Sequence, residues 1–285
     1  DRLNGLRSDA SSRVAILTPG PHNETYFEHA YIARYLGFSL LEGEDLAVED
    51  GRLMVRTVRG LLPVEVLWRR LDAAFSDPLE LNEKSQLGTP GLVSAVREGA
   101  VTMVNALGTG VLESRAMLAF LPRLCHHLLG EPLKISNIAT WWCGQAAERD
   151  YVRHNAAGMM LGEALSTSLP FDYDDSSAIG GRLRGKSAAA LAELIAEEGA
   201  GIVGQEMVTL STTPALVDGR LQPRPLILRM FLARTREGWG VMPGGYARIG
   251  RSLDPTAIAM RRGGSVADVW VISDTPVSQD TMLGQ

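Results

Sequence analysis

The stretch "RVAILTPGPHNETYFEHAYIARYLG", residues 13–37, decides the fold class. Its first part is a short apolar run closed by Pro-Gly, which is typical of a buried strand. The second part predicts a helix, because Thr25 and Glu28 have capping-box spacing and Gly37 suits the position after the last helical residue. A strand that leads directly into a helix indicates a βα unit, and therefore a mainly parallel sheet.

Strand and helix alternate along the chain from this unit to about residue 130. Asp50-Gly51 predicts a two-residue hairpin turn between two short strands. The later segments predict a strand, a short helix, a strand with a turn, and a helix kinked by proline, in "PVEVLWRRLD" (63–72), "GTPGLVSAVREG" (88–99), "AVTMVNALGTG" (100–110) and "ESRAMLAFLPRLCHHLLG" (113–130). We therefore expect an α/β domain with helices on both faces of its sheet.

Beyond about residue 135 the pattern changes to strands that pair locally. An amphipathic helix is expected over residues 187–198, followed by a strand in "GIVGQEMVTLST" (201–212). Residues 224–250 predict a long hairpin, and "GSVADVWVIS" (264–273) predicts a final strand. This is an α+β pattern, so two domains are predicted, 13–135 and 136–277.

The composition limits the classes of partner. A net charge of −5 and a pI near 5.6 argue against nucleic-acid binding, which needs a basic face. No apolar run approaches the roughly 20 residues that span a bilayer. Cys125 and Cys143 form no disulfide framework, so a reducing cytoplasm is the default expectation. Both ends of the chain are polar, which suggests a fragment or a trimmed domain.

A first group of candidate binding residues follows the predicted strands of the first domain. The ends of such strands are where ligands bind in open α/β sheets. The substrate-binding candidates are Asn23, Glu24, Glu28, Arg69, Arg70 and Asp72. Consecutive strand residues point to opposite faces, so at most one of the two arginines enters a given pocket. The alternatives are that Asn23 and Glu24 only make the turn, that Glu28 only closes the capping box, and that Arg and Asp form a surface pair.

Two other patterns are weak. "NALGTGVLES" (105–114) has a partial GxG, but Glu113 occupies the third glycine position, so an ordinary turn is favoured over the dinucleotide loop of a Rossmann-type dehydrogenase. The adjacent Cys125, His126 and His127 diverge around a helix, and no second Cys/His pair lies at zinc spacing, so no metal site is predicted.

Polar residues interrupt the apolar strands of the second domain. Gln205 and Glu206 break one strand, Arg229 breaks the next, and Arg248 follows a double glycine that permits close backbone approach. Buried polar groups need partners, so these four residues are candidates for a nucleotide-binding pocket formed on neighbouring strands of one sheet. The alternative is that they occupy edge-strand positions that face water.

Taken in order, the motifs resemble one family, the circularly permuted ATP-grasp proteins of the glutathionylspermidine-synthase-like group. The resemblance extends from about residue 13 to 277. It rests on "LTPGPHNETYFEHAYIARYLG", "LWRRLDAAFSDPLEL", "LGTPGLVSAVREG", "NALGTGVLES", "IATWWCG", "GQEMVTLST", "LRMFLA", "VMPGGYARIG" and "RRGGSVADVWVIS".

The resemblance implies a pre-ATP-grasp Rossmann-like domain followed by an ATP-grasp-like domain, and ligation of a carboxylate to an amine with ATP and Mg²⁺. By position, Gln205 and Glu206 match the strand that reads adenine and ribose. Arg229 and Arg248 match basic positions near the phosphate and the substrate. The expected substrate is a small-molecule or peptide carboxylate.

Three departures from the family pattern concern the nucleotide site. In "HNAAGMMLGEALSTSLP" (154–170), Gly162 stands where the family tends to have lysine, and the acidic segment "LSTSLPFDYDDSSAIGG" (165–181) replaces a glycine-rich phosphate loop. Ala267 stands where another lysine is expected. The family's metal-binding segment would precede the start of this chain. We therefore expect a degenerate or incomplete nucleotide site, or alternatively a non-catalytic binding or partner subunit that recognises a peptide or amino-acid carboxylate.

Overall fold

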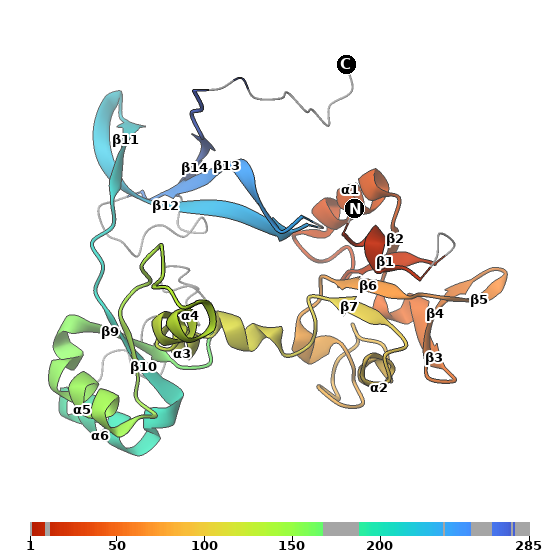
Figure 1. The fold of residues 1–285 in the computed structure, drawn as a ribbon, viewed down its shortest axis with the longest axis horizontal. Coiled ribbons are helices and arrows are strands. Elements are labelled where there is room, and N and C mark those ends of the chain that lie inside the picture. The colour runs from red at the N-terminus through yellow and green to blue at the C-terminus, as the bar shows by residue number, and fades with distance from the viewer. Residues whose placement is uncertain are drawn as a thin grey trace. The chain divides into compact units, whose positions relative to one another are not determined.

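The computed structural model describes residues 2–8, 12–167, 188–235, 237–251, 264–274 and 276 of the chain. Contacts divide the chain into two units, Asp1–Gly110 with Arg234–Gly238, and Val111–Ala233 with Trp239–Gln285 (Figure 1). None of the helices within the described ranges is long and apolar enough to cross a bilayer.

The first unit contains a four-stranded sheet that is parallel throughout. Its strands lie in the order β2 (Ser39–Leu41), β1 (Val14–Leu17), β6 (Val66–Arg69) and β7 (Thr102–Val104). All four residues of β1 are buried, as expected for a parallel strand covered on both faces. The prediction of an α/β fold with a parallel sheet is confirmed.

Helix α1 (Tyr26–Leu36) follows β1 and ends as predicted, because Gly37 adopts a left-handed conformation with φ 69°. Its predicted capping box was wrong. The Thr25 hydroxyl makes no capping hydrogen bond and instead donates to Oδ1 of Asn23 at 2.5 Å. The Glu28 carboxylate is engaged by Arg70 rather than by the helix start.

A smaller antiparallel sheet adjoins the parallel one within the first unit. Its strands lie in the order β3 (Leu46–Glu49), β4 (Arg52–Thr57) and β5 (Gly60–Pro63). Asp50 and Gly51 have φ angles of 49° and 73°, which is the hairpin turn predicted from the Asp-Gly pair. The third strand, β5, was not predicted.

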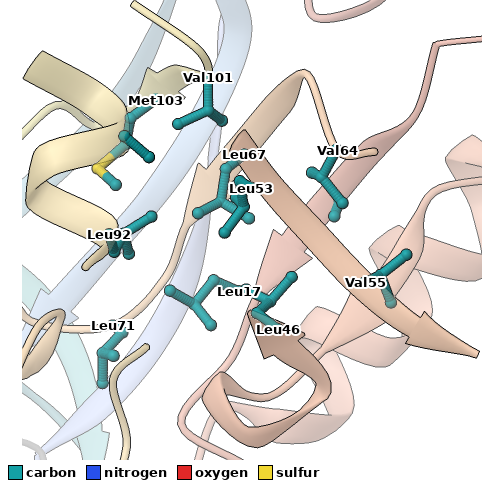
Figure 2. Close-up of a cluster of buried hydrophobic side chains, with 12 residues drawn as sticks. Leu17, Leu46, Leu53, Val55, Val64, Leu67, Leu71, Leu92, Val101 and Met103 are labelled. Carbon is teal, nitrogen blue, oxygen red and sulfur yellow. The ribbon is translucent and has the colours of Figure 1, made fainter. Parts of the chain in front are cut away.

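One hydrophobic core joins the two sheets and helix α2 (Leu92–Arg97) (Figure 2). Leu17 and Leu67 come from the parallel sheet, and Leu46 and Leu53 from the antiparallel sheet. Each is at most 1% exposed. Burial of one such side chain contributes about 1.5–3 kcal/mol, so this cluster holds the strand ends in place.

The loop between β6 and α2 is fixed by buried polar contacts. The Asp77 carboxylate is fully buried and accepts the backbone N–H groups of Leu79 and Val93, each at 2.9 Å. It thereby caps α2. A Cβ at Gly88 would lie 2.2 Å from the Phe75 carbonyl oxygen, so the loop backbones are packed directly against each other.

The second unit contains an antiparallel three-stranded sheet, in the order β8 (Thr140–Trp142), β10 (Ile202–Glu206) and β9 (Met159–Glu163). Helices α5 (Ala146–Asn155) and α6 (Ala188–Glu198) pack against each other, and Val152 and Ile195 are fully buried between the helices and the sheet. The helix predicted over 187–198 is confirmed for its described residues. Helix α5 was not predicted.

The helix predicted over residues 113–130 is two helices, α3 (Arg115–Leu118) and α4 (Leu121–Leu129). The predicted proline kink was wrong, because Pro122 lies in the first turn of α4, where its missing N–H costs no hydrogen bond. Helix α3 contacts β8 and β10. Contacts place α3 and α4 in the second unit, which begins at Val111. The assignment of the predicted domains 13–135 and 136–277 stays a prediction.

A second antiparallel sheet completes the unit, in the order β11 (Thr212–Val217), β12 (Arg220–Arg234), β13 (Trp239–Ile249) and β14 (Ser265–Trp270) (Figure 1). The predicted long hairpin is β12–β13, and the predicted final strand is β14. Short 3₁₀ turns occur between the main elements, at η1 (Asn4–Leu6), η2 (Gly43–Asp45), η3 (Ala73–Phe75), η4 (Thr109–Glu113), η5 (Ala156–Gly158) and η6 (Gly199–Gly201).

Candidate functional site

The parallel sheet of the first unit has a topological switch point between β1 and β6. The chain goes from β1 to β2 on one side, and β6 lies on the other side of β1. Crevices at the carboxyl ends of such strands are the usual ligand sites of open α/β sheets. The predicted substrate-binding residues follow β1 and β6, so the topology places them at this edge.

Arg69, the last residue of β6, and Arg70, which follows it, point in different directions, as strand alternation predicts. Nη2 of Arg70 lies 2.9 Å from Oε1 of Glu28, and its guanidinium lies 5.8 Å from the centre of the Trp68 ring. Nε of Arg69 donates to the Asn105 carbonyl at 2.9 Å, and the Asn105 amide donates to the Arg69 carbonyl at 3.1 Å. Arg70 and Glu28 are thus brought together, and Arg69 joins β6 to the end of β7.

The remaining substrate-binding candidates are Asn23, Glu24 and Asp72. Oδ1 of Asn23 accepts the Thr25 N–H at 2.9 Å, so its side chain forms the turn, as the alternative interpretation proposed. Glu24 and Asp72 are exposed. Arg70 forms its ion pair with Glu28. A role of these residues in substrate binding stays a prediction.

His29 of α1, the helix that follows β1, is a buried polar residue that the sequence did not indicate. It is 2% exposed, and its Nδ1 and Nε2 lie 2.9 and 3.1 Å from the hydroxyls of Thr18 and Thr25. Burial, and then the nearby Arg70 charge, lower the pKa of His29 below its ordinary value of 6.5. The only sequence signal was a histidine four residues after a threonine at a helix start.

The polar residues of β10 point to opposite faces. Gln205 is 2% exposed, and its Nε2 donates to Oγ1 of Thr140 at 3.1 Å. Oε1 of Glu206 accepts the Ala139 N–H at 3.0 Å. Neither residue is on an edge strand, because β10 is the central strand of its sheet. Gln205 is buried there, whereas Glu206 is exposed to water as the alternative proposed.

Arg115 is a second residue that sequence reasoning missed. It begins α3, is 6% exposed, and lies over Gly162 of β9. A Cβ at Gly162 would stand 2.0 Å from Nη1 of Arg115. The backbone fixes this arrangement, since the Arg115 and Ala116 N–H groups donate to the carbonyls of Ser166 and Ala164 at 3.1 and 2.9 Å. A buried guanidinium therefore occupies the space beside the position where the family resemblance led us to expect lysine.

Arg229 and Arg248 lie together on one face of the other sheet. The Arg229 guanidinium is 5.9 Å from the centre of the Tyr246 ring, so both side chains share a face. Arg248 is two residues beyond Tyr246 on β13 and projects to the same side. Asp268 of β14 pairs with Tyr246 and joins this face. The expectation that all four nucleotide-binding candidates lie on one sheet was wrong, because Gln205 and Glu206 belong to β10.

The remaining sequence features concern the glycine turn near Glu113, Ala267, metal ligands and the acidic segment. Glu113 ends the short 3₁₀ turn η4, and Gly108 has φ 83°, as in an ordinary glycine turn. Ala267 pairs with Ala247 in the β13–β14 ladder. Within the described ranges, no group of three or more His, Cys, Asp or Glu side chains could hold a metal ion. The acidic segment from residue 168 onward lies outside the described residues.

Comparisons with known proteins identify the family. The model of the circularly permuted ATP-grasp type 2 family matches residues 1–250. An uncharacterized protein of Synechocystis sp. is 34% identical over 268 residues, which cover 92% of this chain and 54% of that protein. Two uncharacterized proteins of Mycobacterium tuberculosis are 32% and 36% identical over 99% and 90% of this chain, and 50% and 28% of their own lengths. The chain thus spans roughly half or less of these relatives, and it belongs to the circularly permuted ATP-grasp type 2 family.

Proposed function

We propose that this chain belongs to a carboxylate–amine ligase lineage of the glutathionylspermidine-synthase-like type, and that its own nucleotide site is degenerate or incomplete. The observation that carries the proposal is the pairing of Gly162 with the buried Arg115. One guanidinium from a helix stands beside a strand position that lacks any side chain.

The chemistry of this lineage sets clear requirements. Ligation through an acyl phosphate needs cations against the triphosphate and oxygen ligands for magnesium. Arg115 is one cation that could face a phosphate. The described residues include no group of three carboxylate, His or Cys side chains for a metal ion.

The strand expected to read adenine supports the same proposal. Gln205 donates to Thr140, and Glu206 accepts the Ala139 N–H. A nucleobase that used these same atoms would have to replace the internal hydrogen bonds, and each exchange would offset most of its own gain, since a net hydrogen bond contributes about 1 kcal/mol. Tight adenine recognition through these two atoms is therefore disfavoured.

Calorimetric titration with ATP, with and without Mg²⁺, tests the proposal. We expect no magnesium-dependent heat at millimolar nucleotide, for the wild type and for Arg115→Gln alike. Magnesium-dependent binding at micromolar strength that is lost in Arg115→Gln, but kept in the exposed control Arg123→Gln, would overturn the proposed degeneracy and identify Arg115 as a phosphate ligand.

The second candidate function is a non-catalytic subunit that binds an amino-acid or peptide carboxylate. It is favoured by the face of the β11–β14 sheet on which the exposed Arg229 and the half-buried Arg248 project together. Binding of a carboxylate in the absence of nucleotide separates this candidate from a nucleotide-dependent ligase.

A further inference from the structure

The β11–β14 sheet presents a row of side chains with opposite charges on either side of an aromatic ring. Tyr246 of β13 stands in the centre, with Arg229 of β12 against its ring at 5.9 Å and Asp268 of β14 paired with it on the other side. Two strand spacings separate Arg229 from Asp268, roughly 10 Å. Neither residue forms an ion pair in the part of the chain that the structure describes.

Two aromatic side chains, Phe231 and Trp270, lie beside this charged row. Phe231, two residues beyond Arg229, places its ring 5.9 Å from the Tyr246 ring, so it lies on the same face. Trp270 pairs with Gly244, two residues before Tyr246. Phe231 and Trp270 are 42% and 86% exposed, which is unusual for large aromatic side chains.

The two glycines of "PGGY" differ in what requires them. A Cβ at Gly245 would stand 2.3 Å from the Arg229 carbonyl oxygen, so close backbone packing requires glycine there. A Cβ at Gly244 would meet only the Val269 carbonyl, at 3.4 Å, which is an ordinary contact. Gly244 has no positive φ either. Packing therefore does not require glycine at 244, and this buried residue leaves its position on the aromatic face without a side chain.

We propose that this face binds a free α-amino acid with an apolar side chain. The carboxylate would be held by Arg229, with Arg248 adding positive charge on the same face, and the ammonium by Asp268. The side chain would lie over Gly244 between Phe231 and Trp270. In an α-amino acid the carboxylate and the ammonium group are attached to the same carbon. Arg229 and Asp268 would bind these two groups from opposite sides of Tyr246 with charge-assisted hydrogen bonds.

The role of this binding rests on the proposed function, since an amino acid is a substrate of carboxylate–amine ligation. The binding itself requires no nucleotide. A result on ATP therefore leaves this inference standing, and a failure of amino-acid binding leaves the proposed nucleotide site untouched.

Saturation-transfer NMR with L-phenylalanine, N-acetyl-L-phenylalanine and L-phenylalanine amide tests the inference on the wild-type chain. We expect the free amino acid to bind at least about tenfold more tightly than either blocked form, because each block removes one charge-assisted hydrogen bond. Equal binding of the N-acetyl form would overturn the role of Asp268. An absence of binding by all three would overturn the site.

Variants assign the contacts. Asp268→Asn should equalise the free and N-acetyl forms, and Arg229→Gln should equalise the free and amide forms. Asp218→Asn and Arg220→Gln, exposed residues at the β11–β12 turn, should change neither ratio. Circular dichroism checks that each variant folds, which the exposure of Arg229 and Asp268 leads us to expect.

Gly244→Val tests the side-chain position separately. Valine suits a strand, so the sheet should persist, but its methyl groups would fill the space beside Trp270. We expect phenylalanine binding to be lost while glycine binding is kept. Unchanged phenylalanine binding in a folded variant would contradict the proposed position of the amino-acid side chain.

Discussion

Replacing Gly162 by alanine should destabilise the second unit, because the new methyl group would collide with the Arg115 guanidinium. The added Cβ would lie 2.0 Å from Nη1 and 3.2 Å from Cζ of Arg115. Ordinary contacts begin near about 3.5 Å, so the guanidinium would have to retreat by more than about 1 Å. Because Arg115 is only 6% exposed, it has little room to do so.

The size of the effect follows from two opposed terms. Alanine in a strand interior is favoured over glycine by roughly 0.5–1 kcal/mol, because glycine loses more chain entropy on folding. Overpacking a well-packed site costs about 1–3 kcal/mol. The steric term is larger, so we expect a net loss on the order of 1 kcal/mol, which lowers the melting temperature by roughly 2–4 °C for a chain of this size.

Urea unfolding followed by tryptophan fluorescence measures this loss, since Trp141 and Trp142 lie in β8 of the same sheet. Gly158→Ala is the matched control, because a Cβ there would meet no atom within 4 Å. In an Arg115→Ala background, Gly162→Ala should cost nothing, which gives a coupling energy in a double-mutant cycle. Equal stabilities for Gly162→Ala and Gly158→Ala, or an unchanged cost without Arg115, would refute the reasoning.

Three further predictions concern stability and reactivity. Gly88→Ala should destabilise the first unit by about 2 kcal/mol or more, since its Cβ would lie 2.2 Å from a backbone oxygen, whereas Gly110→Ala, with no atom within 4 Å, should be neutral in the same urea assay. The pKa of His29 is lower in the folded than in the unfolded chain, so the unfolded chain binds a proton first as the pH falls. The contribution of His29 to the free energy of unfolding should be complete above about pH 6.5 and should be lost as the pH drops towards the folded pKa. His29→Gln should reduce this pH dependence in thermal melts from pH 8 to 5. Burial raises the pKa of the Cys143 thiol to about 11, so a thiol reagent at pH 8 should modify the partly exposed Cys125 first and Cys143 only on unfolding, as peptide mass spectrometry can follow.

Local sequence patterns determined most of the first unit. The apolar run before Pro-Gly became β1, Gly37 ended α1, and Asp50-Gly51 formed a hairpin turn. These features depend on a few neighbouring residues and on backbone preferences, so they can be predicted without tertiary contacts. The capping box failed because its two partners were drawn to other groups: Thr25 to Asn23 and Glu28 to Arg70, 42 residues away.

Only part of the arrangement of the nucleotide-binding candidates could be predicted from the sequence. Strand polarity singled out Arg229 and Arg248, and the structure places both on the same face of one sheet. The same reasoning grouped them with Gln205 and Glu206, which lie in a different sheet. Sequence spacing does not report which strands pair, because pairing depends on contacts between residues far apart in the chain.

The sequence by itself determined the family, the parallel strand–helix pattern and the absence of a side chain at position 162. Only the tertiary structure decided what fills that space, since Arg115 reaches Gly162 across 47 positions of sequence through the packing of α3 on the sheet. Only pairing between strands set Asp268 opposite Tyr246. The physical reason is that local preferences act within a few residues, whereas burial and charge placement depend on which distant surfaces meet.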